Sequence, residues 1–277
     1  MRSCGTQLNR PGNVNLISPL GAAPDTWELP WPRLRVPSYR ETRLGPWYIR
    51  KIDQVPQRGY FQDLMFIVSQ YTLFTSDNTW MSTAPIETEG QAPHVAAARG
   101  HVAMMGAGLG LALYNILPKA EVTRVTLVER EPQVIDLLRQ ATDMDQWVGI
   151  EKLNIKIMDA FDYCPSDKVN HLYIDIWPMT GDPQALSDVQ RVQKQVKADA
   201  VSWWTQEIAF LRWLEHKEYG HQPSLEHYRE WAREVDLPLI EQDHAAYMAC
   251  VSLVACSVFY KTVRGQEREA AATGETG

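Results

Sequence analysis

The sequence predicts an α/β fold in which a doubly wound, mostly parallel sheet follows a small N-terminal β extension. An unbroken apolar run, Val102 to Met105, leads directly into a glycine-rich turn, and continuous apolar strands are typical of parallel sheets covered on both faces. A helical segment then precedes a second apolar run, 125–128, which ends on Glu129. This acid lies 19 residues beyond Gly110, the spacing expected when a helix crosses between adjacent parallel strands.

The first 45 residues are expected to form an extended arm. Prolines recur between Pro11 and Pro46 at a spacing too close for a long helix. Trp27 and Trp31 lie in the same segment, and a disordered tail rarely carries tryptophan. We therefore expect residues 1–45 to pack on the body of the protein or on a second subunit.

A small β-rich unit is expected over residues 46–95. Residues 47–49 and 71–74 are apolar and aromatic, and residues 76–78, Ser-Asp-Asn, mark a turn. This alternation of short apolar runs and turn residues is typical of strands.

The glycine turn is expected to follow the first strand of the main domain, residues 96–264. A helix is predicted over 109–117, where Pro118 ends it. Two later apolar runs again end on acids, since 155–158 leads into Asp159 and 171–174 leads into Asp175. These features predict a Rossmann-like domain with its site at the carboxyl ends of the strands.

Further elements are expected beyond the fourth strand. Asp182 and Pro183 suit the N-cap and first position of a helix whose apolar face ends near Lys197. Residues 200–204, Ala-Val-Ser-Trp-Trp, are the best candidate for a fifth strand. A second helix is predicted to open at Ser224.

The C-terminal segment shows no clear alternation. The apolar run 245–260 includes Ser252 and Ser257, so it is expected to be a buried strand or helix rather than a membrane span. The final residues, 265–277, are expected to form a disordered tail.

The glycine turn departs from the dinucleotide-binding fingerprint, because Gly110 follows Gly108 by two residues rather than three. Gly106-Ala107-Gly108-Leu109-Gly110 instead resembles motif I of the class I S-adenosylmethionine-dependent methyltransferases. Together with the segments VTLVERE and DAFDY, it is most similar to the spermidine-synthase-like branch. The resemblance covers about residues 80–205.

The resemblance implies that the cofactor is S-adenosyl-L-methionine. Glu129 would accept both ribose hydroxyls, Asp159 would contact the adenine amine, and the glycine turn would hold the methionine side. The residues implied in cofactor binding are Gly106, Ala107, Gly108, Gly110, Glu129, Arg130, Asp159, Ala160 and Asp175.

Asp175 and Trp177 are the candidate catalytic residues. Asp175 ends the fourth strand, where it is placed to orient an acceptor or take its proton; a cofactor or loop-capping contact is the alternative. Trp177 is suited to stack on a flat or cationic acceptor, or else to pack as a core or lid residue.

Other residues near these segments are given supporting roles. Glu87 and Glu89 precede the glycine turn and are expected to be solvated, with a position over the amino-acid end of the cofactor as the alternative. Of Trp203 and Trp204, one is expected in the core and the other in the pocket, because adjacent strand residues face opposite ways.

Methyl transfer to nitrogen or oxygen of a small molecule is the favoured function. The aminopropyl enzymes of the branch carry Asp-Glu-x-x-Tyr-His-Glu before the glycine turn and Asp-x-x-Asp-Pro after the fourth strand. Residues 79–89 read TWMSTAPIETE and residues 175–178 read DIWP, so most carboxylates that would hold a polyamine are missing. The alternatives are an aminopropyltransferase using the decarboxylated cofactor, a non-catalytic nucleoside-binding relative and, third, a nicotinamide dehydrogenase.

Composition narrows the expected partners. A formal net charge of -7 argues against nucleic acid, which normally needs a basic surface. No apolar run reaches membrane-spanning length, and the first residues lack an apolar signal core. A cytoplasmic enzyme without membrane contact is therefore expected. A homodimer is compatible with the sequence. Ten tryptophans favour an apolar or aromatic acceptor pocket.

The cysteines and histidines predict no metal site. Neither residue type shows a metal-ligand spacing. The four cysteines are expected to be buried free thiols, and the seven histidines surface or supporting residues.

Overall fold

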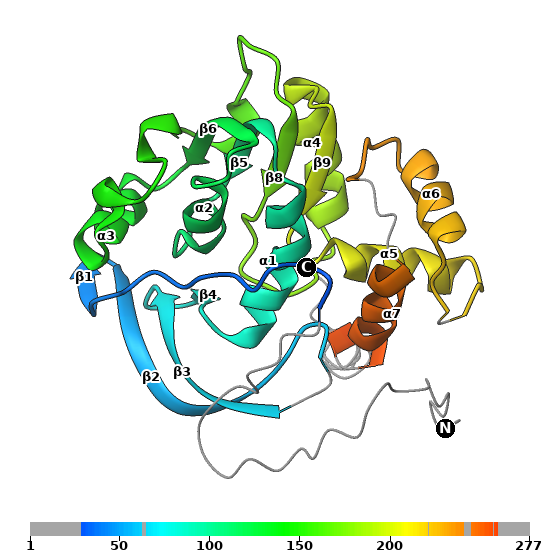
Figure 1. Ribbon diagram of the computed structural model, residues 1–277, viewed down its shortest axis with the longest axis horizontal. Helices are drawn as coiled ribbons and strands as arrows, with labels where there is room; N and C mark the ends of the chain where they lie inside the picture. The colour runs from blue at the N-terminus through cyan, green and yellow to red at the C-terminus, as the bar shows by residue number, and fades with distance from the viewer. Residues whose placement is uncertain (1–28, 63–64, 221, 241–244, 257, 260–277) are drawn as a thin grey trace.

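The computed structural model describes residues 29–62, 65–220, 222–240, 245–256 and 258–259. This part of the chain contains two sheets (Figure 1). The first is antiparallel, in the order β1-β2-β3-β4. Its strands are β1 (Thr42–Leu44), β2 (Trp47–Arg58), β3 (Met65–Phe74) and β4 (Thr79–Ser82).

The second sheet is parallel throughout, in the order β7-β6-β5-β8-β9. The chain winds outward in both directions from β5, the strand that enters the glycine turn, which confirms the predicted doubly wound α/β fold. Its strands are β5 (Gly100–Met105), β6 (Val122–Glu129), β7 (Leu153–Ile157), β8 (His171–Ile174) and β9 (Ala200–Trp203).

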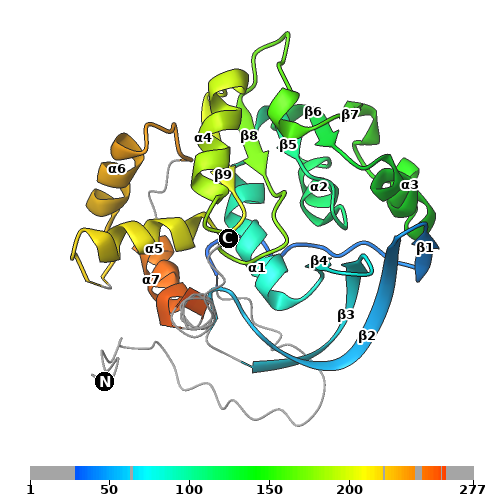
Figure 2. The same ribbon diagram turned by 180° about the vertical axis from the view of Figure 1, so that it is seen from behind.

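Seven α-helices are described, with three short 3-10 turns between them. Helices α1 and α2 contact each other, and α4 packs against β8 (Figure 2). The helices are α1 (Pro85–Ala97), α2 (Leu111–Ile116), α3 (Pro132–Ala141), α4 (Ala185–Val196), α5 (Gln206–His216), α6 (Leu225–Glu234) and α7 (Ala245–Val254), and the turns are η1 (Met144–Gln146), η2 (Ile150–Lys152) and η3 (Ala160–Asp162).

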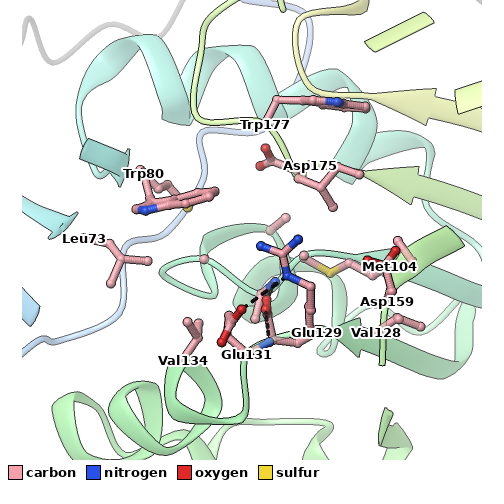
Figure 3. Close-up of a pocket in the computed structure, with 18 of the residues that line it drawn as sticks. Leu73, Trp80, Met104, Val128, Glu129, Glu131, Val134, Asp159, Asp175 and Trp177 are labelled. Carbon is pink, nitrogen blue, oxygen red and sulfur yellow. Dashed lines mark hydrogen bonds and ion pairs between the residues drawn. The ribbon is translucent and has the colours of Figure 1, made fainter. Parts of the chain in front are cut away.

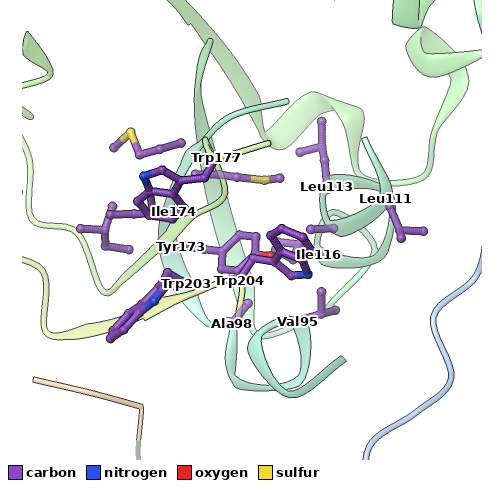
Figure 4. Packing of buried hydrophobic residues seen from close by; sticks show 14 of the residues in the cluster. Val95, Ala98, Leu111, Leu113, Ile116, Tyr173, Ile174, Trp177, Trp203 and Trp204 are labelled. Atoms are coloured by element: carbon purple, nitrogen blue, oxygen red, sulfur yellow. The ribbon is translucent and has the colours of Figure 1, made fainter. Parts of the chain in front are cut away.

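The parallel sheet lies in a continuous apolar core. Strand β5 is buried from His101 to Met105, as expected of a strand covered on both faces. Figure 4 shows side chains of α1, α2 and β8 packed together with Trp203 and Trp204. Both tryptophans are buried, so the expectation that one of them lines a pocket was wrong.

Two predicted helix boundaries were wrong. Helix α2 begins only at Leu111, because Gly110 has a left-handed φ of 71°. Helix α4 begins at Ala185 rather than Pro183. The Asp182 carboxylate accepts from the Gln184 N–H at 2.8 Å, so it closes a turn before the helix instead of capping it.

Helix α7 resolves the ambiguous apolar run, which is helical from Ala245 to Val254. The outer edge of β9 is covered by one short segment, since Val201 donates to Pro238 O at 2.7 Å and accepts from Ile240 N at 3.0 Å. No further strand joins this edge among the described residues.

The described part of the N-terminal arm, residues 29–45, packs on the body, and residues 1–28 lie outside the described residues. The ring centroid of Trp31 lies 5.1 Å from that of Phe61 and 5.8 Å from that of Tyr247. The Tyr39 hydroxyl donates to the Leu109 carbonyl beside the glycine turn at 2.6 Å. Trp27 and the predicted tail, 265–277, lie outside the described residues.

Histidines and cysteines differ in their burial. His94, His101 and His171 are buried, which excludes the expected surface positions for them and leaves the supporting positions that were the alternative. Cys250 is buried as predicted, whereas Cys164 is exposed. Within the described ranges, no helix is both long and apolar enough to cross a membrane.

Candidate active site

A pocket lies where β5, β6 and β8 end, and the N-terminal sheet contributes its opposite wall. Figure 3 shows Trp80 and Leu73 approaching from the side opposite Asp159 and Val128. The carboxyl ends of parallel strands are where ligands bind in open α/β sheets. The topology therefore brings the predicted site residues to one place.

The glycine turn needs glycine for its own backbone and packing. Gly106, Gly108 and Gly110 have φ values of 91°, 49° and 71°, a region that side chains with a Cβ rarely adopt. A Cβ at Gly106 would collide with the Asp175 carbonyl oxygen, and one at Gly108 would lie 2.6 Å from the Met81 sulfur. Gly106, Ala107 and Gly108 line the pocket; Gly110 caps α2 and does not.

Glu129 ties the end of β6 to the glycine turn. Its Oε2 accepts from the Ala107 N–H at 2.8 Å, and its Oε1 accepts from the Glu131 N–H at 2.9 Å. Burial raises the pKa of this carboxyl. Arg130, the next residue, also lines the pocket and pairs with Glu131 at 3.3 Å.

Asp159 follows β7 and caps η3. Its Oδ1 accepts from the Phe161 N–H at 2.8 Å. Asp159, Ala160 and Phe161 all line the pocket. The Arg191 guanidinium lies 4.2 Å from the centre of the Phe161 ring and thus supports this wall from outside.

Asp175 ends β8 and lines the pocket, half-buried. Its Oδ2 accepts from Gln91 Nε2 at 3.2 Å. Removal from water raises the pKa of the Asp175 carboxyl to about 7, and the nearby Tyr173 hydroxyl offsets part of that rise. A carboxylate in this state is suited to take up a proton near neutral pH.

Glu87 and Glu89 are buried, so the expectation that they are solvated was wrong. Burial and the negative charge of Asp175 raise the pKa of Glu87 well above its usual value. Glu89 accepts from the Phe61 and Gln62 N–H groups at 2.9 and 3.3 Å and does not line the pocket. Glu87 therefore belongs to the surroundings of Asp175, and Glu89 to the interior scaffold.

Aromatic side chains form two sides of the pocket. The Trp177 indole donates to Asp188 at 2.9 Å, which fixes its ring. Trp47 and Trp80, from β2 and β4, lie with ring centroids 5.4 Å apart. Sequence reasoning missed the wall formed by the N-terminal sheet, although tryptophans at the ends of predicted strands were a signal for it.

The side chains that line the pocket match the chemical groups of S-adenosylmethionine. Glu129 and Asp159 offer carboxylate oxygens for a ribose and an exocyclic amine, and Val128, Val134 and Phe161 offer apolar contact for a base. The residues suited to the methionine end are the glycine turn and Asp175. Across the described ranges, no group of three or more His, Cys, Asp or Glu side chains is arranged to hold a metal ion.

Comparisons with known proteins found similarity only among solved structures. No protein-family model and no curated protein matches the chain. A candidate RNA methyltransferase from Pyrococcus horikoshii is 21% identical, over 37% of this chain and 47% of that one, with a TM-score of 0.29. A complex of DhpI with SAH is 18% identical, over 35% and 44%, with a TM-score of 0.27.

Spermidine synthase from Thermotoga maritima is matched over a longer stretch. It is 18% identical, over 59% of this chain and 54% of that one, with a TM-score of 0.35. This chain thus spans only about half the length of these solved structures.

The fold itself follows from the chain's own topology. Its central strand enters the glycine turn, and the strands on either side end on acids that meet at one pocket. A small antiparallel sheet precedes this arrangement and closes the pocket. The chain therefore has a doubly wound α/β fold of Rossmann type, preceded by a small antiparallel sheet.

Proposed function

We propose that this protein is an S-adenosylmethionine-dependent methyltransferase that acts on nitrogen or oxygen of a small molecule. The observation that carries the proposal is the convergence of the glycine turn, Glu129 and Asp159 on one pocket that also contains Asp175. The first three features suit a nucleoside and its side chain. Asp175 adds a proton acceptor at the same edge of the sheet.

Asp175 has a defined part in the proposed reaction. When bound, the cofactor supplies an electrophilic methyl group, whose bond to sulfur breaks with the electron pair staying on sulfur. The acceptor's lone pair forms the new bond to carbon, and the acceptor's N–H or O–H proton passes to the Asp175 carboxylate. Orientation of the acceptor would supply much of the rate, and Trp177 and Trp80 are placed to hold a flat acceptor.

Aminopropyl transfer is a second candidate, favoured by the charges near Asp175. Glu87 adds a buried carboxyl beside it. Arg130 is the one cationic side chain among the described residues that line the pocket, and it neighbours Glu129 rather than Asp175. An amine without a carboxylate, as in the decarboxylated cofactor, would meet no repulsion here.

Calorimetric titration with S-adenosylmethionine, its decarboxylated form and NAD in parallel tests these proposals. Glu129→Ala should weaken binding of the preferred cofactor at least about tenfold, because it removes the carboxylate proposed to hold the ribose. Since Glu129 also bonds the glycine turn, Glu129→Gln provides a milder second variant. Glu121→Ala, at the exposed start of β6, is the matched control and should leave affinity unchanged.

The titration separates the alternatives. Preference for intact S-adenosylmethionine supports methyl transfer, and preference for the decarboxylated form supports aminopropyl transfer. If none of the three ligands binds, or if the Glu129 variants bind as well as the wild type, the proposed site is wrong.

A further inference from the structure

Behind the pocket, helix α1 and strand β8 face each other with polar side chains. Glu87, Gln91 and His94 follow one another at helical spacing on α1. His171, Tyr173 and Asp175 alternate along β8 and its carboxyl end, on one face of the sheet. We call these six residues the polar seam.

Contacts join the two rows of the polar seam. Gln91 Nε2 donates to Asp175 Oδ2 at 3.2 Å. The rings of His94 and Tyr173 stack with centroids 5.5 Å apart. Glu87 is close enough to Asp175 for the negative charge of one to act on the other. The seam thus runs from the pocket edge into the core.

Asp175 and Gln91 are the two members of the polar seam that line the pocket. Asp175 is half-buried, whereas Gln91 is fully buried. The hydrogen bond from Gln91 occupies Oδ2. Oδ1 is consequently the oxygen that an acceptor would meet.

The side chain of Gln91 lies in an energetically unfavourable environment. Its Oε1 is buried and has no hydrogen-bond partner among the described residues. A buried carbonyl without a partner is unfavourable, and an apolar side chain would avoid that loss. This cost points to a role other than packing.

We propose that Gln91 is the positioning residue of Asp175: it holds one carboxylate oxygen so that the other faces the acceptor as the proton acceptor of the reaction. The inference rests on the proposed function for its catalytic meaning. The hydrogen bond between Gln91 and Asp175 and the protonation state of Asp175 do not depend on a bound cofactor. Both can therefore be measured in the cofactor-free protein.

Several groups around Asp175 bear on its protonation. Tyr173 and Glu87 are its titratable neighbours on β8 and α1, and Glu207 on α5 acts on Tyr173. His94 is also buried, and its pKa is lowered to about 3 by loss of solvent, so its ring is neutral. Tyr173 and Gln91 are therefore the neutral donors beside Asp175. Gln91 is the one with a formed hydrogen bond, at 3.2 Å, so its loss should disfavour the ionised carboxylate.

The test is to titrate Asp175 in the full-length, cofactor-free protein by carbon NMR of labelled aspartate, with Asp175→Asn assigning the signal. The wild-type carboxyl should titrate near pH 7. Gln91→Leu should move the titration to higher pH by about half a unit or more. Gln190→Leu, on α4 and outside the pocket, is the matched control and should leave the titration unchanged.

Activity gives the second readout. Once an acceptor is found, Gln91→Leu should lower kcat at least about tenfold while leaving the Kd for S-adenosylmethionine within about twofold, and the acid limb of the pH profile should move up with the NMR titration. If Gln91→Leu fails to fold, Gln91→Met replaces it with the same expectations.

An unmoved Asp175 titration in the Gln91 variants would overturn the inference, whatever the cofactor titration shows. A moved titration together with no cofactor binding would leave the positioning contact standing and refute the methyltransferase proposal instead. A purely structural role of Gln91 predicts lost stability with an unchanged titration, whereas the proposed role predicts a moved titration.

Discussion

Asp175 and Glu129 are two carboxyl groups of one pocket that suit different roles, because their hydrogen-bond partners differ. Glu129 accepts two backbone N–H bonds at 2.8 and 2.9 Å, which favour its ionised form. Asp175 accepts one bond from a neutral amide at 3.2 Å, and its pKa rises to about 7 because of burial. The first is suited to hold hydroxyl donors, and the second to take a proton.

At the residue scale, the pH dependence of the reaction is expected to follow Asp175. Its ionised form is the active one, so kcat should rise with pH through about 7. The Tyr173 hydroxyl lowers the pKa of Asp175, although it makes no well-formed hydrogen bond among the described residues. Tyr173→Phe should therefore move the acid limb to higher pH.

A pH profile of methyl transfer checks this expectation once an acceptor is known. Asp175→Asn should abolish the limb together with most of the activity. A limb that stays near pH 4, or one that Tyr173→Phe moves downward, would contradict the role given to Asp175.

At the scale of elements, α7 is joined to the body through a buried carboxyl group. Glu207 on α5 accepts from the Tyr247 hydroxyl at 2.7 Å and from the Tyr60 hydroxyl at 3.1 Å. Tyr247 also meets the ring of Trp31 from the N-terminal arm. Four distant segments of the chain thus meet at one interior point.

Tyr247→Phe should destabilise the protein by about 1–3 kcal/mol, because it removes a hydrogen bond to a buried carboxyl and leaves that group with one partner fewer. Urea unfolding measures the change. Tyr219→Phe, which removes an exposed hydroxyl from Glu230, is the control and should change stability little. Equal effects of the two variants would contradict the anchoring role of Glu207.

At the scale of the whole molecule, buried acids dominate the titration of the native state. Burial raises the pKa of five carboxyl groups, Glu87, Glu89, Glu129, Asp175 and Glu207, the values for Glu89, Asp175 and Glu207 being about 7. Burial also lowers the pKa of His94 and His171 to about 3. Below about pH 7 the native protein therefore keeps protons on Glu89, Asp175 and Glu207, and near neutral pH its buried His94 and His171 are neutral.

These shifts predict that stability is greatest in the mildly acidic range. The acids bind more protons in the native state, so their contribution is lost as pH rises through about 7. The histidines act oppositely, but their effect is complete above about pH 6.5. Tm should consequently fall by roughly 5 °C or more between pH 6 and 8.

Thermal unfolding across this range, in wild type and in Glu207→Gln, checks the expectation. The variant removes one titrating acid and should show a shallower fall. A Tm that is flat or rises from pH 6 to 8 would show that these acids ionise without cost.

Local chemistry accounts for what could be predicted of the fold and the site. The apolar runs, the glycine turn and the acids at strand ends lie within short stretches of sequence, so their spacing predicts both the parallel sheet and the pocket edge. Helix α1 escaped prediction because it contains Gly90 and Pro93 and buries polar side chains, against the usual helical pattern.

By itself, therefore, the sequence determined the α/β class, the strands around the glycine turn and the residues at the pocket edge, because each depends on neighbours along the chain. Only the tertiary structure decided that Glu87 and Gln91 lie beside Asp175 and that the N-terminal sheet forms a wall of the pocket. Gln91 and Asp175 lie 84 positions apart in the sequence. Whether Glu87 and Asp175 are charged is set by their burial in the folded protein, not by their spacing in the sequence.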